Sequence, residues 1–238
     1  MINNFVKVNG GIFVRKKDFQ VKKGLTIPEI TVKVNGFYID DFVVTQADWS
    51  NVMGYNPSHF KCVELPVEMV SWHEAVLFCN EKSKKDGMQL CYTIESEHVE
   101  CDFTANGYRL PTEAECEFAA IGGNESKGYQ YAGSDILDEV AWYAKNAGRT
   151  THPRGQKKPN ELGLYDMCGN VFEWCWDWFD KFDCAYMDNP KGPLKGTMKV
   201  SRGNNWVNGE STSAVTRRVH RVVNAITHHQ GFRIVRSE

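Results

Sequence analysis

Cysteine has the widest chemistry of the residue types in this sequence, and its placement argues against part of that chemistry. There are 8 cysteines, with none in the first sixty residues or the last fifty. No CxxC or HxxxH pair occurs, so the spacing argues against a zinc site. The even number permits disulfides, but the scattered spacing does not resemble a small disulfide scaffold. The eight are Cys62, Cys79, Cys91, Cys101, Cys116, Cys168, Cys175 and Cys184.

Three of these cysteines, Cys79, Cys116 and Cys175, lie among aromatic and aliphatic neighbours. We expect their thiols to be buried as small hydrophobic groups. A disulfide between Cys91 and Cys101, which would close the segment CYTIESEHVEC, remains an alternative to two free thiols.

Histidine and tryptophan suggest two further kinds of site. The adjacent His228 and His229 could bind a metal, but a pair without a third ligand is a weak indication. Trp174, Trp176 and Trp178 could form a platform on which a sugar stacks. Their alternation is typical of one face of a strand, so we interpret them mainly as core residues.

The composition is that of an ordinary soluble globular protein. Of the 238 residues, 42% are hydrophobic and 24% charged, and the net charge is −2. This charge argues against nucleic acid as the main partner. No apolar run approaches the roughly 20 residues of a transmembrane helix, and the N-terminus lacks a signal-peptide pattern. A leader removed from the chain would leave the same sequence.

Local patterns place strands first and helices next. Strands are expected over 5–14, 30–34 and 36–39, and near 171–174, 200–202 and 232–235. Helices are expected after Thr45, after Ser71 with Glu74 as a capping box, and after Thr112 with Glu115 as another. Residues 124–198 are rich in Gly, Pro, Asn, Asp and tryptophan, which indicates ordered loops. We therefore expect an α+β fold with much irregular structure, forming a single domain over 1–238.

Seven motifs follow one another along the chain. They are Thr45-Gln46, Leu65-Pro66-Val67-Glu68 with Val70-Ser71-Trp72, Tyr108 to Glu115, Asn160 to Met167, Gly169 to Trp174, Arg202 to Trp206, and Gly231-Phe232-Arg233. In this order they resemble the motifs of the formylglycine-generating (sulfatase-modifying factor) enzymes, from about residue 7 to 236, nearly the whole chain. The resemblance implies their variant of the C-type lectin fold.

The family's catalytic chemistry is not expected here. The enzymes use two cysteine thiolates that bind copper and activate oxygen, and the matching positions are Asn208 and Ser213. An amide and a hydroxyl supply neither a thiolate nucleophile nor a soft metal ligand. We therefore expect no catalytic residues and no required cofactor.

The resemblance also implies a structural calcium ion, bound by oxygen atoms only. The alternative is that its two carboxylates bond backbone amides in a tight loop. The matching positions are Asp166, Gly169, Val171 and Glu173.

The composition of 204–229 indicates a different function. Codons of the AAC type mutated only at adenines cannot encode Lys, Gln, Glu, Met or Trp. Within 204–229 only Trp206 and Glu210 fall outside the set that such codons can reach. This pattern resembles the variable segment of proteins diversified by retroelements, and we assign 202–233 as a variable region. The expected exposed contact residues are Asn204, Val207, Asn208, Gly209, Ser211, Thr212, Arg217, His220, Val223, Asn224, Ile226, Thr227, His228 and His229, and the expected core residues are Trp206, Val215, Phe232 and Ile234.

The sequence therefore predicts a non-catalytic protein that binds varied ligands through a C-terminal surface. The partner is expected to be a protein or a glycan at a surface, with affinity that depends on pH between about 5 and 8 because of the histidines. The resemblance suggests a cell-surface lipoprotein if a leader has been removed. The alternatives are an oxidoreductase of altered chemistry on the same scaffold and an accessory surface domain without variation.

Overall fold

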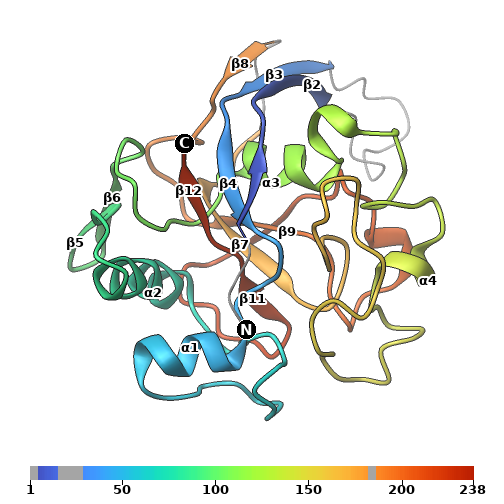
Figure 1. Ribbon diagram of the computed structural model, residues 1–238, viewed down its shortest axis with the longest axis horizontal. Coiled ribbons are helices and arrows are strands. Elements are labelled where there is room, and N and C mark those ends of the chain that lie inside the picture. The colour runs from blue at the N-terminus through green and yellow to red at the C-terminus, as the bar shows by residue number, and fades with distance from the viewer. Residues whose placement is uncertain (1–4, 16–28, 182–185) are drawn as a thin grey trace.

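The computed structural model describes residues 5–15, 29–181 and 186–238, so Cys184 lies outside the described residues. Within these ranges, four helices and twelve strands are joined by long irregular segments (Figure 1). The strands are β1 (Phe5–Val8), β2 (Gly11–Arg15), β3 (Ile30–Val34), β4 (Phe37–Asp40), β5 (Tyr92–Glu95), β6 (His98–Cys101), β7 (Phe172–Trp178), β8 (Tyr186–Asp188), β9 (Lys199–Arg202), β10 (Val219–Arg221), β11 (Gln230–Phe232) and β12 (Val235–Ser237). The helices are α1 (Gln46–Met53), α2 (Trp72–Lys85), α3 (Glu113–Ala120) and α4 (Leu137–Val140), with 3₁₀ turns η1 (Gly123–Glu125) and η2 (Glu210–Thr212).

The strands form four small sheets rather than one large sheet. Their orders are β1-β4-β12, β2-β3-β8, β10-β9-β7-β11 and β5-β6. In the sheet that carries the C-terminal region, β9 is antiparallel to β7 and to β10, whereas β11 is parallel to β7. The loop from β9 to β10 and the loop from β10 to β11 therefore both belong to the predicted variable region.

Each of the three longer helices begins at the predicted N-cap. Thr45, Ser71 and Thr112 each accept a hydrogen bond from the third helical residue, whose carboxylate bonds back to the cap. These reciprocal bonds satisfy backbone donors that would otherwise lack partners at a helix start. Gly54 ends α1 in the left-handed conformation, which glycine adopts without steric cost.

Two hydrophobic clusters fill the molecule. One lies between β2, β3 and α3 and includes Phe13 and Phe118. The other joins α1, α2 and β11, where Trp49 stacks on Phe78 at 5.4 Å between ring centres. Such rigid aromatic contacts stabilise a scaffold beyond the area that they bury.

The Gly-Phe-Arg motif near the C-terminus joins these parts. A Cβ atom at Gly231 would lie 2.6 Å from the carbonyl oxygen of Val67, so only glycine fits. Phe232 packs edge-on against Phe78, and buried Arg233 forms an ion pair with Glu173. The motif therefore fixes where the variable segment ends.

The irregular region between η1 and β7 is ordered by side chains that bond the backbone. Asn160 donates to the carbonyl oxygen of Ala119 at 2.7 Å and accepts from the amides of Leu162 and Leu164. One asparagine thus substitutes for the hydrogen bonds of regular structure.

A membrane-spanning helix would need a long apolar segment, and none of the helices in the described part of the chain has one.

The thiols follow the sequence expectation, and the disulfide alternative was wrong. Cys79, Cys116 and Cys175 are buried, and Cys91 and Cys101 are both free. Burial raises the pKa of Cys91 to about 11, so its reactive thiolate form is scarce at neutral pH.

The tryptophans of β7 are only partly core residues. Trp174 is fully buried, whereas Trp176 and Trp178 are half-buried around the side chain of Lys199. The ammonium nitrogen of Lys199 lies 3.9 Å from the ring centre of Trp178 and 4.0 Å from that of Trp72. The cation–π contact with Trp178 occupies one indole face of the predicted platform for a sugar.

Candidate functional site

The segment from Gly203 to His229 is held at its centre by one buried arginine. Arg202, at the end of β9, donates to the carbonyl oxygens of Val215, Thr216 and Arg217 at 3.0 to 3.4 Å. Its guanidinium also forms an ion pair with Glu117 at 2.9 Å. The arginine of the Arg202–Trp206 motif thus binds the variable segment through backbone atoms.

A second ion pair holds the next turn. Arg218 donates to both carboxylate oxygens of Glu113, at 2.6 and 2.8 Å. Burial alone would raise the pKa of Glu113, but Arg218 and the neighbouring arginines reverse this effect and the pKa is lowered. Glu113 is therefore charged when it binds the segment.

Further carbonyl groups of the segment accept hydrogen bonds from amides of the scaffold. The distances between the donor nitrogen and the acceptor oxygen are 2.9 to 3.1 Å. Because every residue has a carbonyl group, these bonds do not depend on the side chain at the accepting position. The pairs are Ala144 to Asn208, Trp72 to Val223, Met69 to Thr227 and Phe172 to His229.

Two residues of the Arg202–Trp206 motif fix the conformation at the start of the segment. The side chain of Asn205 accepts from the amides of Val207 and Asn208, each at 2.9 Å. Trp206 donates from its backbone amide to Asn170 and from its indole to the carbonyl oxygen of His228. The two loops of the variable region are therefore joined directly to each other.

Most of the predicted contact residues are accessible to solvent. Val207 is 45% exposed and Ile226 is 51% exposed. The exposed members are Val207, Gly209, Ser211, His220, Asn224 and Ile226, and the half-buried members are Asn208, Thr212, Arg217, Val223, Thr227, His228 and His229.

Predicted exposure was wrong outright for Asn204, whereas the seven half-buried members are only partly exposed. Asn204 is fully buried, and its amide group donates to the hydroxyl of Ser213 inside the loop. Trp206 and Val215, expected in the core, are half-buried instead, whereas Phe232 and Ile234 are buried as predicted. Val222, which the sequence analysis omitted, is 51% exposed.

A cluster of rings extends the surface beyond the variable segment. Phe60, from the loop after α1, packs edge-on against Trp206 at 5.5 Å between ring centres. His59 lies 5.7 Å from His228 by the same measure. No local pattern pointed to His59 or Phe60, because their proximity to the segment depends on tertiary packing.

The two positions that the resemblance matches to catalytic cysteines, Asn208 and Ser213, take part in hydrogen bonds of the loop. Ser213 is buried, and its hydroxyl donates to the carbonyl oxygen of Gly209. Asn208 is half-buried, and its backbone amide and carbonyl are both hydrogen-bonded. Their hydrogen bonds stabilise the loop.

The expected calcium ligands are near one another but are used unequally. Burial raises the pKa of Asp166 to about 6, and its Oδ1 atom has no hydrogen-bond partner. Glu173 directs both carboxylate oxygens to Arg233 at 3.0 Å. The unpartnered, buried oxygen of Asp166 is an atom that a cation would satisfy, but the described residues hold no cluster of three or more His, Cys, Asp or Glu side chains that could bind a metal ion. Gly169 and Val171 would contribute carbonyl groups.

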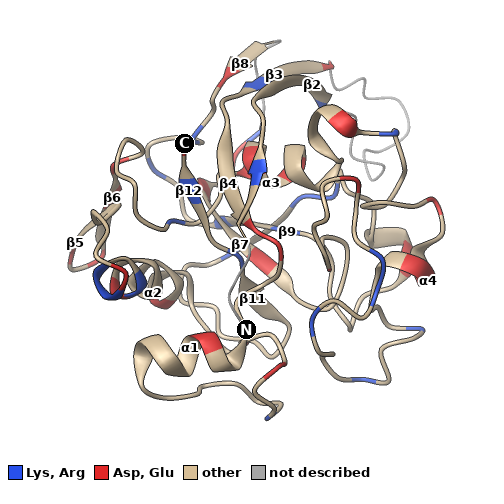
Figure 2. Cartoon of the chain, in the orientation of Figure 1, with Lys and Arg blue, Asp and Glu red and all other residues tan. Residues whose placement is uncertain are grey.

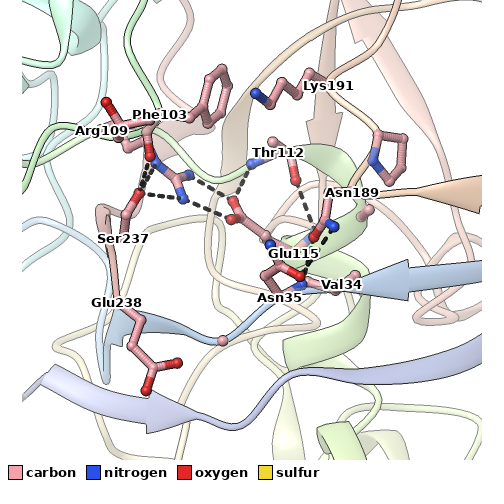
Figure 3. Close-up of a pocket in the computed structure, with 14 residues that line it drawn as sticks. Val34, Asn35, Phe103, Arg109, Thr112, Glu115, Asn189, Lys191, Ser237 and Glu238 are labelled. Atoms are coloured by element: carbon pink, nitrogen blue, oxygen red, sulfur yellow. Dashed lines mark hydrogen bonds and ion pairs between the residues drawn. The ribbon is translucent and has the colours of Figure 1, made fainter.

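A further cavity lies away from these loops. A pocket of about 750 Å³ lies beside β12, and Arg109, Glu115 and Ser237 are among its lining residues (Figure 3). Arg109 donates to both oxygens of Glu115 at 2.7 Å, so the charges of that pair neutralise each other. The pocket is lined in part by the Tyr108–Glu115 motif, but none of the expected contact residues or calcium ligands lines it.

The fold and the site together define a scaffold of the formylglycine-generating type whose C-terminal loops are held by the frame. The family model "Sulfatase-modifying factor enzyme 1-like domain" matches residues 1–238, and the chain belongs to this family. The chain is also similar in structure to Treponema denticola variable protein 1, with a TM-score of 0.90 and 32% identity over 98% of this chain and 95% of that one. The predicted α+β fold of this type, with much irregular structure, is confirmed.

Two proteins that are similar to this chain in sequence carry different functional names. The chain is 38% identical over 268 residues to "Chaperone protein LppX" of Paenibacillus barcinonensis, a match that covers 99% of this chain and 90% of that protein. It is 29% identical over 178 residues to the formylglycine-generating enzyme of Bos taurus, covering 69% of this chain and 41% of the enzyme.

Proposed function

We propose that this protein is a non-catalytic binding protein whose C-terminal segment is diversified by a retroelement. The observation that carries the proposal is the separation of roles along 204–229. Groups of the protein outside this segment bind mainly to its backbone. Several of its side chains face solvent instead, namely those of Val207, Ser211, Asn224 and Ile226. Exposed side chains can change at little cost in stability. The likeness to Treponema denticola variable protein 1 supports the same function.

The absence of catalysis is part of the proposal. Asn208 and Ser213 occupy the positions of the two catalytic cysteines. The double variant Asn208→Cys and Ser213→Cys tests whether the rest of the family's copper site is present on this scaffold. We expect the unaltered chain, incubated with copper and a cysteine-containing sulfatase peptide, to form no aldehyde by mass spectrometry. Aldehyde formed by the unaltered chain would contradict the proposal.

Deep sequencing of the 3′ end of the gene across a cell population tests diversification directly. We expect substitutions confined to codons 204–229 and located at the adenines of a nearby template copy. The codons of Arg202, Trp206 and Phe232 should remain constant and serve as internal controls. An invariant 3′ end would contradict the proposal.

A second function is suggested by the chaperone relative. Binding of an unfolded or extended protein segment would use the same exposed loops, without variation between copies. Suppression of aggregation of a reduced model protein such as insulin distinguishes the two functions. A chaperone should suppress it at near-stoichiometric ratio, whereas a diversified binder should not.

We also propose that calcium binds at Asp166, with carbonyl groups of Gly169 and Val171 and the shared carboxylate of Glu173. The support is the unpartnered, buried oxygen of Asp166. The cation would provide charge compensation and stability rather than chemistry.

We also propose that the protein is a lipoprotein at the cell surface. Cell fractionation combined with labelling of intact cells tests this location.

A further inference from the structure

A groove of about 380 Å³ lies between fixed and variable parts of the molecule. Its apolar lining is Leu77 from α2, Ile94 from β5 and Trp178 from the end of β7. Leu77 and Ile94 are 39% exposed each. Exposed apolar side chains that share one hollow, rather than lying singly, mark an interaction site. The volume suits one large side chain and part of its neighbours.

One wall of this groove comes from the predicted variable region. It is formed by Val223 and Asn224, in the loop after β10. The carbonyl oxygen of Val223 accepts from the amide of Trp72 at 3.0 Å, which fixes the wall against α2. The shape of the wall can therefore change with its side chains while its position stays constant.

The rim of the groove is acidic. Glu97, at the turn of the β5–β6 hairpin, is exposed and forms no hydrogen bond or ion pair with any residue that the structure describes. Glu74 uses its Oε2 atom at the start of α2, where the amide of Ser71 donates at 2.8 Å. Its Oε1 atom has only the hydroxyl of Tyr55 at 3.4 Å. Acidic residues also lie elsewhere on the β5–β6 hairpin (Figure 2), outside the groove lining, and Glu100 among them lies 3.2 Å from the Nε2 atom of His98.

The nearby basic groups do not neutralise this rim. Lys199 is buried beneath the ring of Trp178 and is inaccessible from the groove. Burial and the charge of Lys199 lower the pKa of His73 against the opposing effect of Glu97, which favours the neutral imidazole. The groove therefore combines an apolar floor with uncompensated carboxylates.

We propose that this groove binds an extended peptide segment in which a leucine, isoleucine or phenylalanine lies next to a lysine or arginine. The apolar side chain would pack on Leu77, Ile94 and Trp178, and the cation would pair with Glu97. The fixed residues supply this general preference, and Val223 and Asn224 adjust it. Only this adjustment rests on the proposed diversification, because the groove itself does not require it.

A displayed library of random dodecapeptides, selected on the full chain, is the test. We expect enriched peptides to contain an apolar residue beside Lys or Arg. A synthetic peptide from the enriched set should bind at least tenfold more weakly to Glu97→Lys and to Leu77→Asp. Matched exposed substitutions away from the groove, Glu125→Lys and Leu194→Asp, should leave its affinity unchanged.

Three outcomes would overturn the proposal: enrichment of acidic peptides, unaltered binding by the two groove variants, or no enrichment. Binding on a glycan array that depends on Trp178, without peptide enrichment, would assign the groove to a carbohydrate instead. Variation at the 3′ end without peptide binding would reject the groove and keep the diversification. An invariant 3′ end with peptide binding would do the reverse.

Discussion

Two buried arginines hold the C-terminal segment against the rest of the protein. Arg202 and Arg233 are both fully buried, and each has carboxylate and carbonyl partners. A buried charge is costly unless such partners surround it. Arg202 holds the middle of the variable segment, and Arg233 follows its end. Arginine suits both positions because its guanidinium group presents several donors in a fixed geometry.

His229 should make the stability of the fold depend on pH. Burial, Arg221 and His228 lower its pKa from 6.5 to about 4. The unfolded chain therefore binds more protons between these values, and stability is lost as the pH falls from 6.5 to 4. We expect a decrease of about 1–2 kcal/mol, less than the full shift would give, because the ring is only half-buried. Urea unfolding across this range measures it, and His229→Phe should flatten the profile. Equal slopes in both proteins would contradict this assignment.

Asp166 should make stability respond to calcium. Burial raises its pKa to about 6, so the folded state loses stability as the pH rises from 3.8 through 6. Calcium at 100 times its dissociation constant would add about 2.7 kcal/mol. We expect 1 mM CaCl₂ to raise the unfolding temperature at pH 7.5, and Asp166→Asn to abolish the increase. MgCl₂ is the control, and an unchanged unfolding temperature with calcium would reject the site.

At the scale of elements, local signals predicted what depends on local physics. Capping boxes at Ser71 and Thr112 predicted helix starts because the reciprocal bonds are made within four residues. Alternating apolar residues predicted β3, where Ile30, Val32 and Val34 are buried. The β5–β6 hairpin was not predicted, because its segment was interpreted as a possible disulfide loop between Cys91 and Cys101.

Tertiary contacts decided the features that the sequence did not predict. Burial of Asn204 depends on the loop that folds over it and places Ser213 beside its amide. The groove at Trp178 needs α2, β5 and the loop after β10 to meet. The order of strands in the four sheets is likewise non-local. Composition predicted a variable segment, and contacts decide which of its residues are accessible.

The separation of roles within the segment predicts unequal costs of substitution. The combined variant Val207→Thr, Ser211→Asn, Asn224→Ser and Ile226→Asn should lower the free energy of unfolding by at most about 2 kcal/mol, since each exposed change is worth about 0.5 kcal/mol. Trp206→Ala alone should cost about 2–3 kcal/mol, because its indole packs on Phe60 and binds the carbonyl of His228. Urea denaturation compares them, and a larger cost for the combined variant would contradict the proposed roles.

At the scale of the whole molecule, the two ends of the described chain share one sheet. β1 and β12 lie on either side of β4 (Figure 1). The backbone of Val235 also exchanges two hydrogen bonds with Arg109, at 2.8 and 2.9 Å. The last strand therefore joins the N-terminal sheet to the segment before α3.

Removing 235–238 should prevent cooperative folding. The deletion exposes one edge of β4 and removes buried Val235 from the first hydrophobic cluster. We expect no cooperative thermal transition by circular dichroism. Deletion of Glu238 alone is the control, because its ion pair with Lys7 is exposed and such pairs contribute little. A normal transition after the longer deletion would show that β12 is dispensable.

The bonds between the frame and the carbonyl groups of the segment have a consequence for populations of related chains. A carbonyl group is present in every amino acid, including proline, so no codon change can remove these acceptors. Copies that differ at the exposed positions would therefore share nearly one unfolding temperature. Selection among such copies would act on what each one binds rather than on whether it folds.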